Sequence, residues 1–337
     1  MNLNHIFLFL AIVSPLLVLA RAWRPGAPYH GWRIAALVVL AVTGISWIFW
    51  PGAAGYIGGF TWFLLLFLPA IGLRKMTELA SRGDYKSARN LAAALQILHP
   101  TAELREQIRL FRRLESSGNQ DAIRSPRVRG EITQHHQLRH APAVLIFILL
   151  NAFAFLFEIS VGNWNDPEVL HRIGALEPHA VVVQGEYWRL FTALFLHAGF
   201  THLLFNLFAL YILGPPLERS IGTVRFAVCY LVSGLASSAG VVLLTTFGLV
   251  QVAQLVGASG CIMGVVGAWA GFLLIHRHAP LAKQRLANIF LIVVIQTAFD
   301  LSTPQVSMAA HISGLIGGFL LGLLLSPRNA AADFRRH

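Results

Sequence analysis

Apolar residues in this chain are gathered into nine long runs, in a pattern of three, a break and then six. The runs cover residues 3–20, 34–50, 56–73, 141–160, 202–217, 226–247, 259–275, 287–299 and 306–325. A helix that crosses the hydrocarbon of a bilayer needs about 17–25 mainly apolar residues, and most of the runs qualify. The runs at 202–217 and 287–299 are short, so we expect them to depend on neighbouring or flanking residues. The pattern predicts an all-α polytopic membrane protein.

The break between the two groups of runs, residues 74–140, is hydrophilic and predicts a small helical insert. Its stretch from Gly83 to Pro100 resembles the second half of a tetratricopeptide repeat. The following segment, 102–115, is amphipathic, with Leu104, Ile108 and Phe111 (or Leu114) on one face. One such repeat cannot bury a solenoid core. A spacer and a module that binds a cytosolic partner are therefore equally good interpretations.

These segments predict four parts. Residues 1–73 hold three N-terminal transmembrane helices, and residues 74–140 hold the insert, with 116–129 as its linker. Residues 141–326 form a six-helix transmembrane core, and residues 327–337 form a cytosolic tail.

The distribution of positive charge predicts the topology. If the first helix runs from outside to inside, the inside segments hold 24 of the 26 Lys and Arg residues, 13 of them in the insert. Only Arg172 and Arg189 remain outside. Positive residues favour the cytoplasmic side, so we expect nine spans, an outside N-terminus and a cytoplasmic C-terminus. The alternative is a cleaved signal peptide ending at Ala20–Ala22, but the start of the chain lacks the usual positive charge.

Composition agrees with a membrane protein. The 337 residues are 56% hydrophobic and only 12% charged, whereas soluble domains carry about a quarter charged residues. The net charge of +11 follows from topology, so we expect the lipid bilayer and no nucleic acid as partner. The two cysteines give neither a disulfide framework nor zinc spacing. We expect no metal and no cofactor, since the histidines show no ligand spacing.

The first candidate for chemistry is Ser259, in the sequence Gly257-Ala258-Ser259-Gly260. A lone serine here is most simply a helix cap or a packing residue. However, this serine begins a helix at the outer face, where backbone N–H groups are unpaired and the helix dipole is positive. Such an end favours a developing oxyanion.

A second candidate is His311, inside an apolar run. An intramembrane histidine usually faces a partner or a cavity, and a hydrogen-bonded packing histidine is the plainer interpretation. Its helix carries Gly314, Gly318 and Gly322 at four-residue spacing, and the serine helix carries Gly260, Gly264, Gly267 and Gly271. Two such glycine faces can pack very closely. Close packing would bring a serine–histidine pair within hydrogen-bonding reach.

A third pair, His202 and Asn206, shares one face of a helix that enters from outside. Both side chains can donate hydrogen bonds to an oxyanion, although asparagine in a span also joins helices. We expect no acidic third member beside the histidine, and we expect an interfacial role for Asp300. A Ser–His dyad is chemically sufficient in principle.

Five motifs in this order resemble those of the rhomboid family of intramembrane serine proteases, over about residues 141–325. They are Trp188-Arg189, His202-x-x-x-Asn206, Gly214-x-x-x-Glu218-x-x-x-Gly222, Gly257-Ala258-Ser259-Gly260 and Ala310-His311-x-x-Gly314-x-x-x-Gly318. One departure is Met263, which stands where the family often has an aromatic residue.

The resemblance implies catalytic roles for Ser259 as nucleophile and His311 as base, with His202, Asn206 and the Ser259 N–H as the oxyanion hole. It implies structural roles for Trp188, Arg189, Glu218, Arg219, Gly257, Gly260, Gly264, Gly314 and Gly318. Glu218 and Arg219 would belong to an inside turn, and Arg189 would be an interfacial anchor in a long first loop.

The implied activity is cleavage of single-span membrane proteins near the outer membrane face. A catalytically silent relative that binds or escorts membrane helices is the alternative. A transporter or channel would need inverted repeats or paired intramembrane acids, and neither is evident. The N-terminus is not transit-like, so we expect a bacterial plasma membrane.

Overall fold

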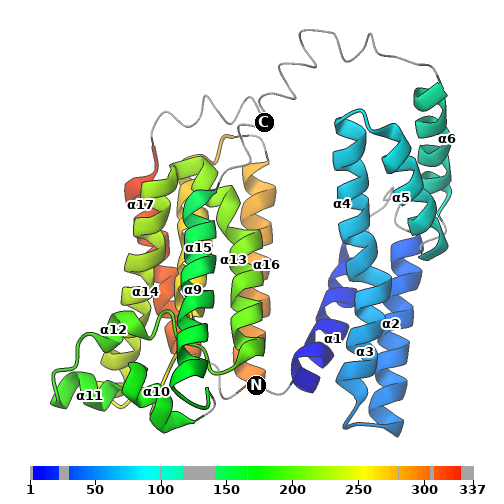
Figure 1. Ribbon diagram of the computed structural model, residues 1–337. Coiled ribbons are helices and arrows are strands. Elements are labelled where there is room, and N and C mark those ends of the chain that lie inside the picture. The colour runs from blue at the N-terminus through cyan, green and yellow to red at the C-terminus, as the bar shows by residue number, and fades with distance from the viewer. Residues whose placement is uncertain are drawn as a thin grey trace. The chain divides into compact units, whose positions relative to one another are not determined.

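The computed structural model describes residues 3–22, 30–98, 101–116, 141–164, 166–279, 281–303 and 307–327. Within these ranges the chain is helical and has a single isolated backbone bridge, between Leu176 and Leu255 (Figure 1). Seven of the described helices are long and apolar enough to cross a membrane. Two shorter apolar helices, Leu3–Leu19 and Ser259–Ile275, accompany them. The expected all-α polytopic fold is confirmed.

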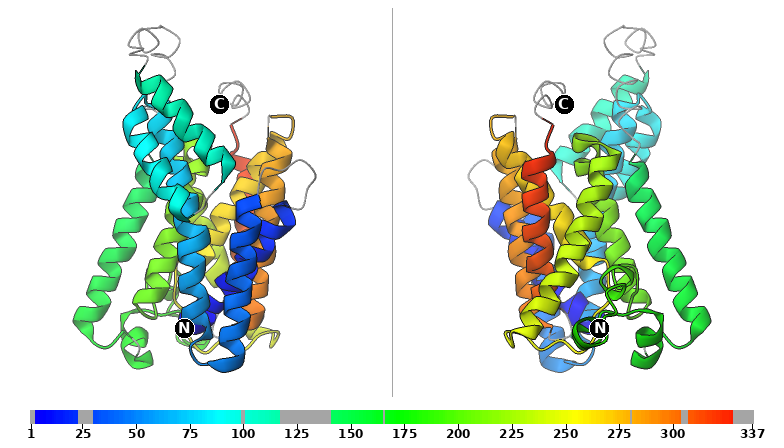
Figure 2. Two further views of the ribbon diagram at one scale, coloured as in Figure 1. Left: turned by 90° about the vertical axis from the view of Figure 1, so that its right-hand side faces the viewer. Right: turned by 90° about the vertical axis from the view of Figure 1, so that its left-hand side faces the viewer.

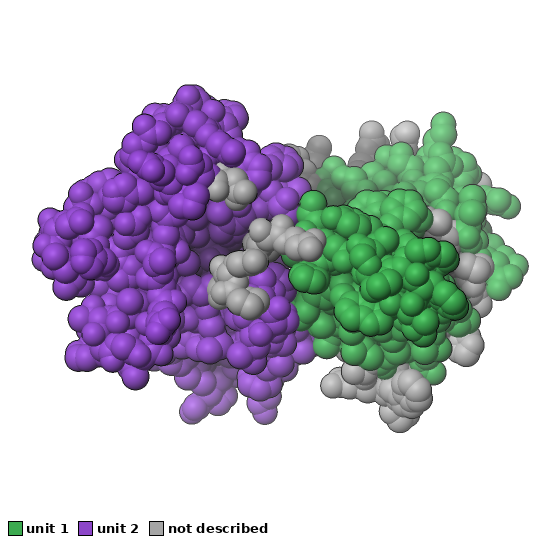
Figure 3. Space-filling model, turned by 90° about the horizontal axis from the view of Figure 1, so that it is seen from below, with its two compact units in different colours: residues 1–138 green, residues 139–337 purple. Residues whose placement is uncertain are grey.

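The chain divides into two compact units, residues 1–138 and 139–337, which Figure 3 colours green and purple. The helices of the first unit are α1 (Leu3–Ala22), α2 (His30–Phe49), α3 (Ala54–Trp62), the π-helix η1 (Phe63–Phe67), α4 (Leu68–Ser81), α5 (Tyr85–Leu98) and α6 (Ala102–Ser116).

The N-terminal helices of the first unit are joined by a buried asparagine and by close glycine contacts. The side-chain oxygen of Asn4 in α1 accepts hydrogen bonds from the backbone N–H groups of Gly55 (2.8 Å) and Tyr56 (3.2 Å) at the start of α3. These N–H groups have no partner within their own helix. Helix α3 continues through the π-helix into α4. The π-helix ends two residues before Pro69, whose ring strains the preceding turn of a regular α-helix.

The insert packs against the end of α4. Its apolar cluster joins Met76 of α4 with residues of α5 and α6, namely Ala88, Ala92, Leu95, Leu104 and Phe111. The amphipathic segment forms α6, and its predicted apolar face is the face that is buried. The predicted insert begins at residue 74, but α4 runs on to Ser81 because polar residues at the end of a span continue a helix readily. Most of the predicted linker and the cytosolic tail lie outside the described residues.

The second unit contains nine helices among the described residues. They are α9 (Pro142–Val161), α10 (Pro167–Ile173), α11 (Pro178–Val183), α12 (Arg189–Thr192), α13 (Phe200–Ile221), α14 (Thr223–Thr246), α15 (Ser259–Ile275), α16 (Ala282–Ser302) and α17 (Met308–Leu325). The short helices α10, α11 and α12 lie together at one end of this unit (Figure 1).

Two helices of this unit are longer than their apolar runs. The run 202–217 belongs to a helix of 22 residues, and the run 287–299 belongs to a helix of 21 residues. Helix α16 gains its first turns from Lys283, Gln284 and Arg285, which form helix readily but add nothing to an apolar run. Both helices are therefore long enough to span without help from other segments.

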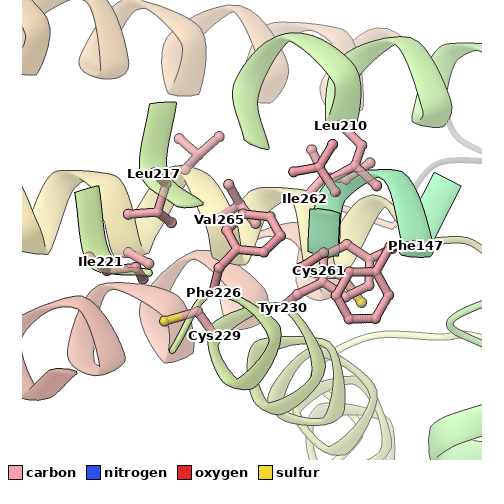
Figure 4. Close-up of a cluster of buried hydrophobic side chains, with 14 of the residues drawn as sticks. Phe147, Leu210, Leu217, Ile221, Phe226, Cys229, Tyr230, Cys261, Ile262 and Val265 are labelled. Atoms are coloured by element: carbon pink, nitrogen blue, oxygen red, sulfur yellow. The ribbon is translucent and has the colours of Figure 1, made fainter. Parts of the chain in front are cut away.

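The core of the unit is an apolar cluster in which α13 and α14 meet α15 and the start of α9. Figure 4 shows Leu210, Leu217, Phe226, Tyr230 and Val265 among its members. The rings of Phe147 and Tyr230 stack with centroids 4.1 Å apart. Helix α15 is buried along almost its whole length, so its position is set by packing on several sides. This buried helix carries Ser259 at its first residue.

Candidate active site

Helices α15 and α17 pack against each other with their backbones almost in contact. A Cβ atom added to Gly318 would lie 2.6 Å from the Cα of Gly264, and one added to Gly314 would lie 3.3 Å from the Cα of Gly260. Real Cβ atoms are essentially never found closer than 3.0 Å, so only glycine fits at Gly318. The paired residues advance in step along both helices, which therefore run parallel. Figures 1 and 2 show α17 and α14 side by side in the same bundle.

This parallel packing brings Ser259 and His311 to the same end of the unit. Ser259 is the first residue of α15, and His311 lies in the first turn of α17. A Cβ on Gly260 would lie 3.8 Å from the carbonyl oxygen of Ala310, so the residues adjoining the serine and the histidine are neighbours. The Ser259 side chain is half-buried, whereas His311 is buried. Within the described part of the chain, no hydrogen bond joins the two side chains.

The N-terminus of α15 presents backbone N–H groups that no side chain caps. Ala258 is the N-cap residue and has no side-chain hydrogen bond to offer. The first N–H groups of a helix lack intrahelical acceptors and lie at the positive end of its dipole. This end of α15 can therefore stabilise negative charge that develops next to Ser259.

His202 and Asn206 of α13 lie against Gly257, two residues before this helix begins. Gly257 has φ +131°, and a Cβ there would lie 2.7 Å from Cε1 and 2.9 Å from Nε2 of His202, and 3.7 Å from Nδ2 of Asn206. Glycine is thus required both by the backbone conformation and by the space that His202 occupies. The Nδ2 atom of Asn206 is buried without an acceptor among the described residues. Such an unmet donor is rare and suggests a functional reason.

His311 has an acidic partner, which corrects the expectation for Asp300. The Asp300 carboxylate is buried rather than interfacial, and its Oδ2 lies 2.8 Å from Nδ1 of His311. The other oxygen, Oδ1, accepts a hydrogen bond of 2.8 Å from Nε2 of Gln296, which also lies 3.3 Å from Nδ1 of His311. Helix α16 does not end before Asp300 but continues to Ser302, and this last turn carries the carboxylate to the histidine.

Two further buried residues that the sequence did not single out support His202. The His197 ring lies 5.2 Å from the His202 ring, in an edge-to-face arrangement. The backbone N–H of His197 donates a hydrogen bond of 2.9 Å to Oε1 of the buried Glu158 in α9. Burial lowers the pKa of His197 to about 3, so its ring is neutral. A carboxylate inside an apolar run, two residues before its end, was the signal that could have drawn attention to Glu158.

Arg189 is buried and holds the first loop together through hydrogen bonds. The expectation that it is an interfacial anchor is therefore corrected. Its guanidinium donates hydrogen bonds to the carbonyl oxygens of His171 (2.7 Å) and Ala175 (3.1 Å), and it pairs with Glu186. It also lies 4.7 Å from the ring centre of Trp188. The five N–H donors of a guanidinium can bond to several carbonyl oxygens of a loop at once. The loop therefore folds around this side chain.

The Glu218 carboxylate caps another helix. Its two oxygens accept hydrogen bonds from the backbone N–H groups of Ala143 (2.9 Å) and Val144 (3.0 Å) at the start of α9. Arg219 donates a hydrogen bond to the carbonyl oxygen of Pro215 within its own helix. Both residues lie at the opposite end of α13 from His202. Among the described residues, no group of three or more His, Cys, Asp or Glu side chains could hold a metal ion.

The comparisons with known proteins all identify rhomboid proteins as similar to this chain. Residues 184–328 match the model of the rhomboid domain. The chain is 34% identical over 191 residues to YdcA of Bacillus subtilis (strain 168), a protein provisionally named a rhomboid protease, and covers 90% of that protein. It is 35% identical over 192 residues to the rhomboid protease GluP of the same organism, and 39% identical over 169 residues to RHOMBOID-like protein 6, mitochondrial, of Arabidopsis thaliana.

The matches cover 57% and 49% of this chain, but only 36% of GluP and 53% of the Arabidopsis protein. The similarity to YdcA covers 56% of this chain.

Proposed function

Because this chain belongs to the rhomboid family and is an integral multi-pass membrane protein, we propose that it is an intramembrane serine endopeptidase. In this proposal Ser259 is the nucleophile and His311 is the general base. The substrates are single-span membrane proteins that are cut near the outer membrane face. The relatives named as proteases support this activity, and the residues needed for it are all present.

The proposal rests on the packing of three helices around the N-terminus of α15, where His202 and Asn206 lie against Gly257 and the carbonyl oxygen of Ala310 lies near Gly260. Ser259 comes from α15, His311 from α17, and His202 and Asn206 from α13. The glycine at position 257 leaves room for the two α13 donors beside the serine. A nucleophile, a base and donors for an oxyanion are the parts that acyl transfer requires.

The proposed reaction has two halves. In the first, Ser259 Oγ attacks the carbonyl carbon of the scissile amide while His311 takes its proton. The carbonyl oxygen becomes an oxyanion that accepts hydrogen bonds from His202, Asn206 and the Ser259 backbone N–H. His311 then gives the proton to the leaving amine as the C–N bond breaks. In the second half, His311 takes a proton from water as the water oxygen attacks the acyl carbon. His311 then gives this proton to Ser259 Oγ as the ester C–O bond breaks, which releases the new carboxylic acid.

Replacing Asn206 by alanine tests the oxyanion donors. We expect kcat to fall by about 10²–10³-fold with little change in KM, because the lost hydrogen bond acts mainly in the transition state. The measurement is the initial rate of cleavage over a range of substrate concentrations. Asn151→Ala is the matched control, since Asn151 is a buried asparagine that bonds to Phe147 and Tyr230 and has no part in the proposed oxyanion hole. Equal losses of kcat in both variants would contradict the proposed role.

We also propose that the protein lies in a bacterial plasma membrane, with its N-terminus outside and its C-terminus in the cytoplasm. The charge distribution supports this topology. The insert, with its α5 and α6 helices, would then lie in the cytoplasm, where it could receive a cytosolic partner.

The test of the function is direct. The full chain is purified, reconstituted in lipid vesicles and mixed with a single-span test substrate whose helix contains small residues. We expect two fragments, with the cut near the outer end of the substrate helix. We also expect a fluorophosphonate probe to label Ser259, as located by mass spectrometry. If the folded chain binds such substrates but neither cuts them nor reacts with the probe, the escort function is favoured instead.

A further inference from the structure

The last turn of α16 places a buried carboxylate and a carboxamide against the histidine of the site. Asp300 and His311 are 6% and 3% exposed. The contact between Oδ2 and Nδ1 is 2.8 Å, and the contact between Gln296 Nε2 and Oδ1 is also 2.8 Å. One oxygen of the carboxylate therefore accepts from the carboxamide, and the other faces an imidazole nitrogen. Intramembrane carboxylates are rare and usually functional, and this one has a defined partner.

The carboxylate decides which imidazole nitrogen carries the proton. An ionised carboxylate only accepts hydrogen bonds, so the nitrogen that faces it, Nδ1, is the protonated one. In the neutral ring Nε2 is then left with its lone pair, and this is the form in which a histidine can take a proton from a serine. Because Gln296 donates to Oδ1, the carboxylate is also held in one orientation. His202 also lies within electrostatic reach of His311.

We propose that Asp300 is a positioning residue that converts the Ser259–His311 pair into a triad, with Gln296 orienting its carboxylate. This inference rests on the proposed function. Asp300 fixes the Nδ1–H tautomer and the ring orientation, and its negative charge stabilises the imidazolium that forms while the serine proton resides on His311. It gains no proton itself.

The competing explanation is that the pair only joins two helices. Helix α16 is the least buried of the seven candidate spans, so its contact with α17 through His311 also contributes to its attachment. The two explanations differ in what changes when the charge alone is removed. A purely structural contact affects folding, whereas a positioning contact affects kcat in protein that is still folded.

The experiment compares Asp300→Asn with wild type in lipid vesicles, alongside Ser259→Ala as the inactive reference and Glu168→Gln as a matched control at an exposed acid. We expect Asp300→Asn to lower kcat by about 10²–10⁴-fold with KM changed less than about threefold. Glu168→Gln should match wild type. Asp300→Glu should recover part of the lost rate, because it restores the charge.

The outcomes separate the two proposals. If wild type cleaves, Ser259→Ala does not, and Asp300→Asn keeps the wild-type kcat, the triad is wrong and the protease proposal stands. If wild type does not cleave, both fail. Should Asp300→Asn not fold, nitrogen-15 spectra of the histidine rings in wild type, assigned with His311→Gln, give the answer. A proton on Nδ1 supports the inference, and a neutral ring with its proton on Nε2 overturns it.

Discussion

Alanine in place of Ser259 or His311 is expected to lower kcat/KM for a single-span substrate by about 10⁴-fold or more while the protein stays folded. Without Oγ there is no nucleophile, and without the imidazole nothing removes the hydroxyl proton. The two residues act as a unit, so the double variant should lose no more activity than either single variant. The measurement is the rate of fragment formation by wild type and the three variants.

Controls of the same chemical type make this result interpretable. Ser160→Ala and His278→Ala replace an exposed serine and an exposed histidine of the same unit. Both should keep wild-type rates. Intrinsic tryptophan fluorescence during heating should give similar unfolding midpoints for all variants. Cleavage that persists in Ser259→Ala would mean a different nucleophile or a contaminating protease, and the proposed mechanism would then have to be abandoned.

The sequence predicts the helices that hold the site because the relevant signals are local. Apolar runs report the spans, and glycines at four-residue spacing report faces that pack closely. From these two signals alone, α15 and α17 are expected to be parallel neighbours with Ser259 and His311 at the same end. The structure has this arrangement. In the structure, the backbones of Gly318 and Gly264 are in contact.

The acidic partner of His311 could not be found in this way. Asp300 lies at the end of a short apolar run, where a carboxylate is most often interfacial. Whether it points into the protein depends on how far the helix continues and on its rotation about its own axis. The hydropathy pattern predicts neither the end of the helix nor its rotation. Helix α16 carries polar residues at both ends, and few of its positions are buried.

The structure of the first loop could not be predicted from local sequence patterns either. Arg189 resembles an anchor because it follows a tryptophan at the expected outer face. Its burial comes from the carbonyl groups of His171 and Ala175, which reach it only once α10 and the following turn have folded. Side chains that satisfy distant loop acceptors depend on tertiary structure. For the same reason, the support of His202 by His197 and Glu158 could not be derived from the order of residues.

Gly318→Ala is expected to have a large effect on both folding and activity. The new Cβ would lie 2.6 Å from the Cα of Gly264, and both atoms belong to helices that are fixed on several sides. Backbone cannot turn aside as a flexible side chain can, so the helices must separate or tilt. Overpacking of this kind costs roughly 1–3 kcal/mol and occasionally more. A shift of about 1 Å between nucleophile and base can lower the rate about 10²-fold.

We therefore expect Gly318→Ala to have a lower unfolding midpoint and at least a 10²-fold lower kcat/KM. Gly44→Ala is the matched control, because Gly44 lies in a candidate span of the first unit and a Cβ there meets nothing within 4 Å. Alanine also favours helix over glycine, so the control should be neutral or slightly stabilising. A Gly318→Ala protein with wild-type unfolding and cleavage would show that α15 and α17 can separate freely. Close glycine packing would then not be what aligns Ser259 with His311.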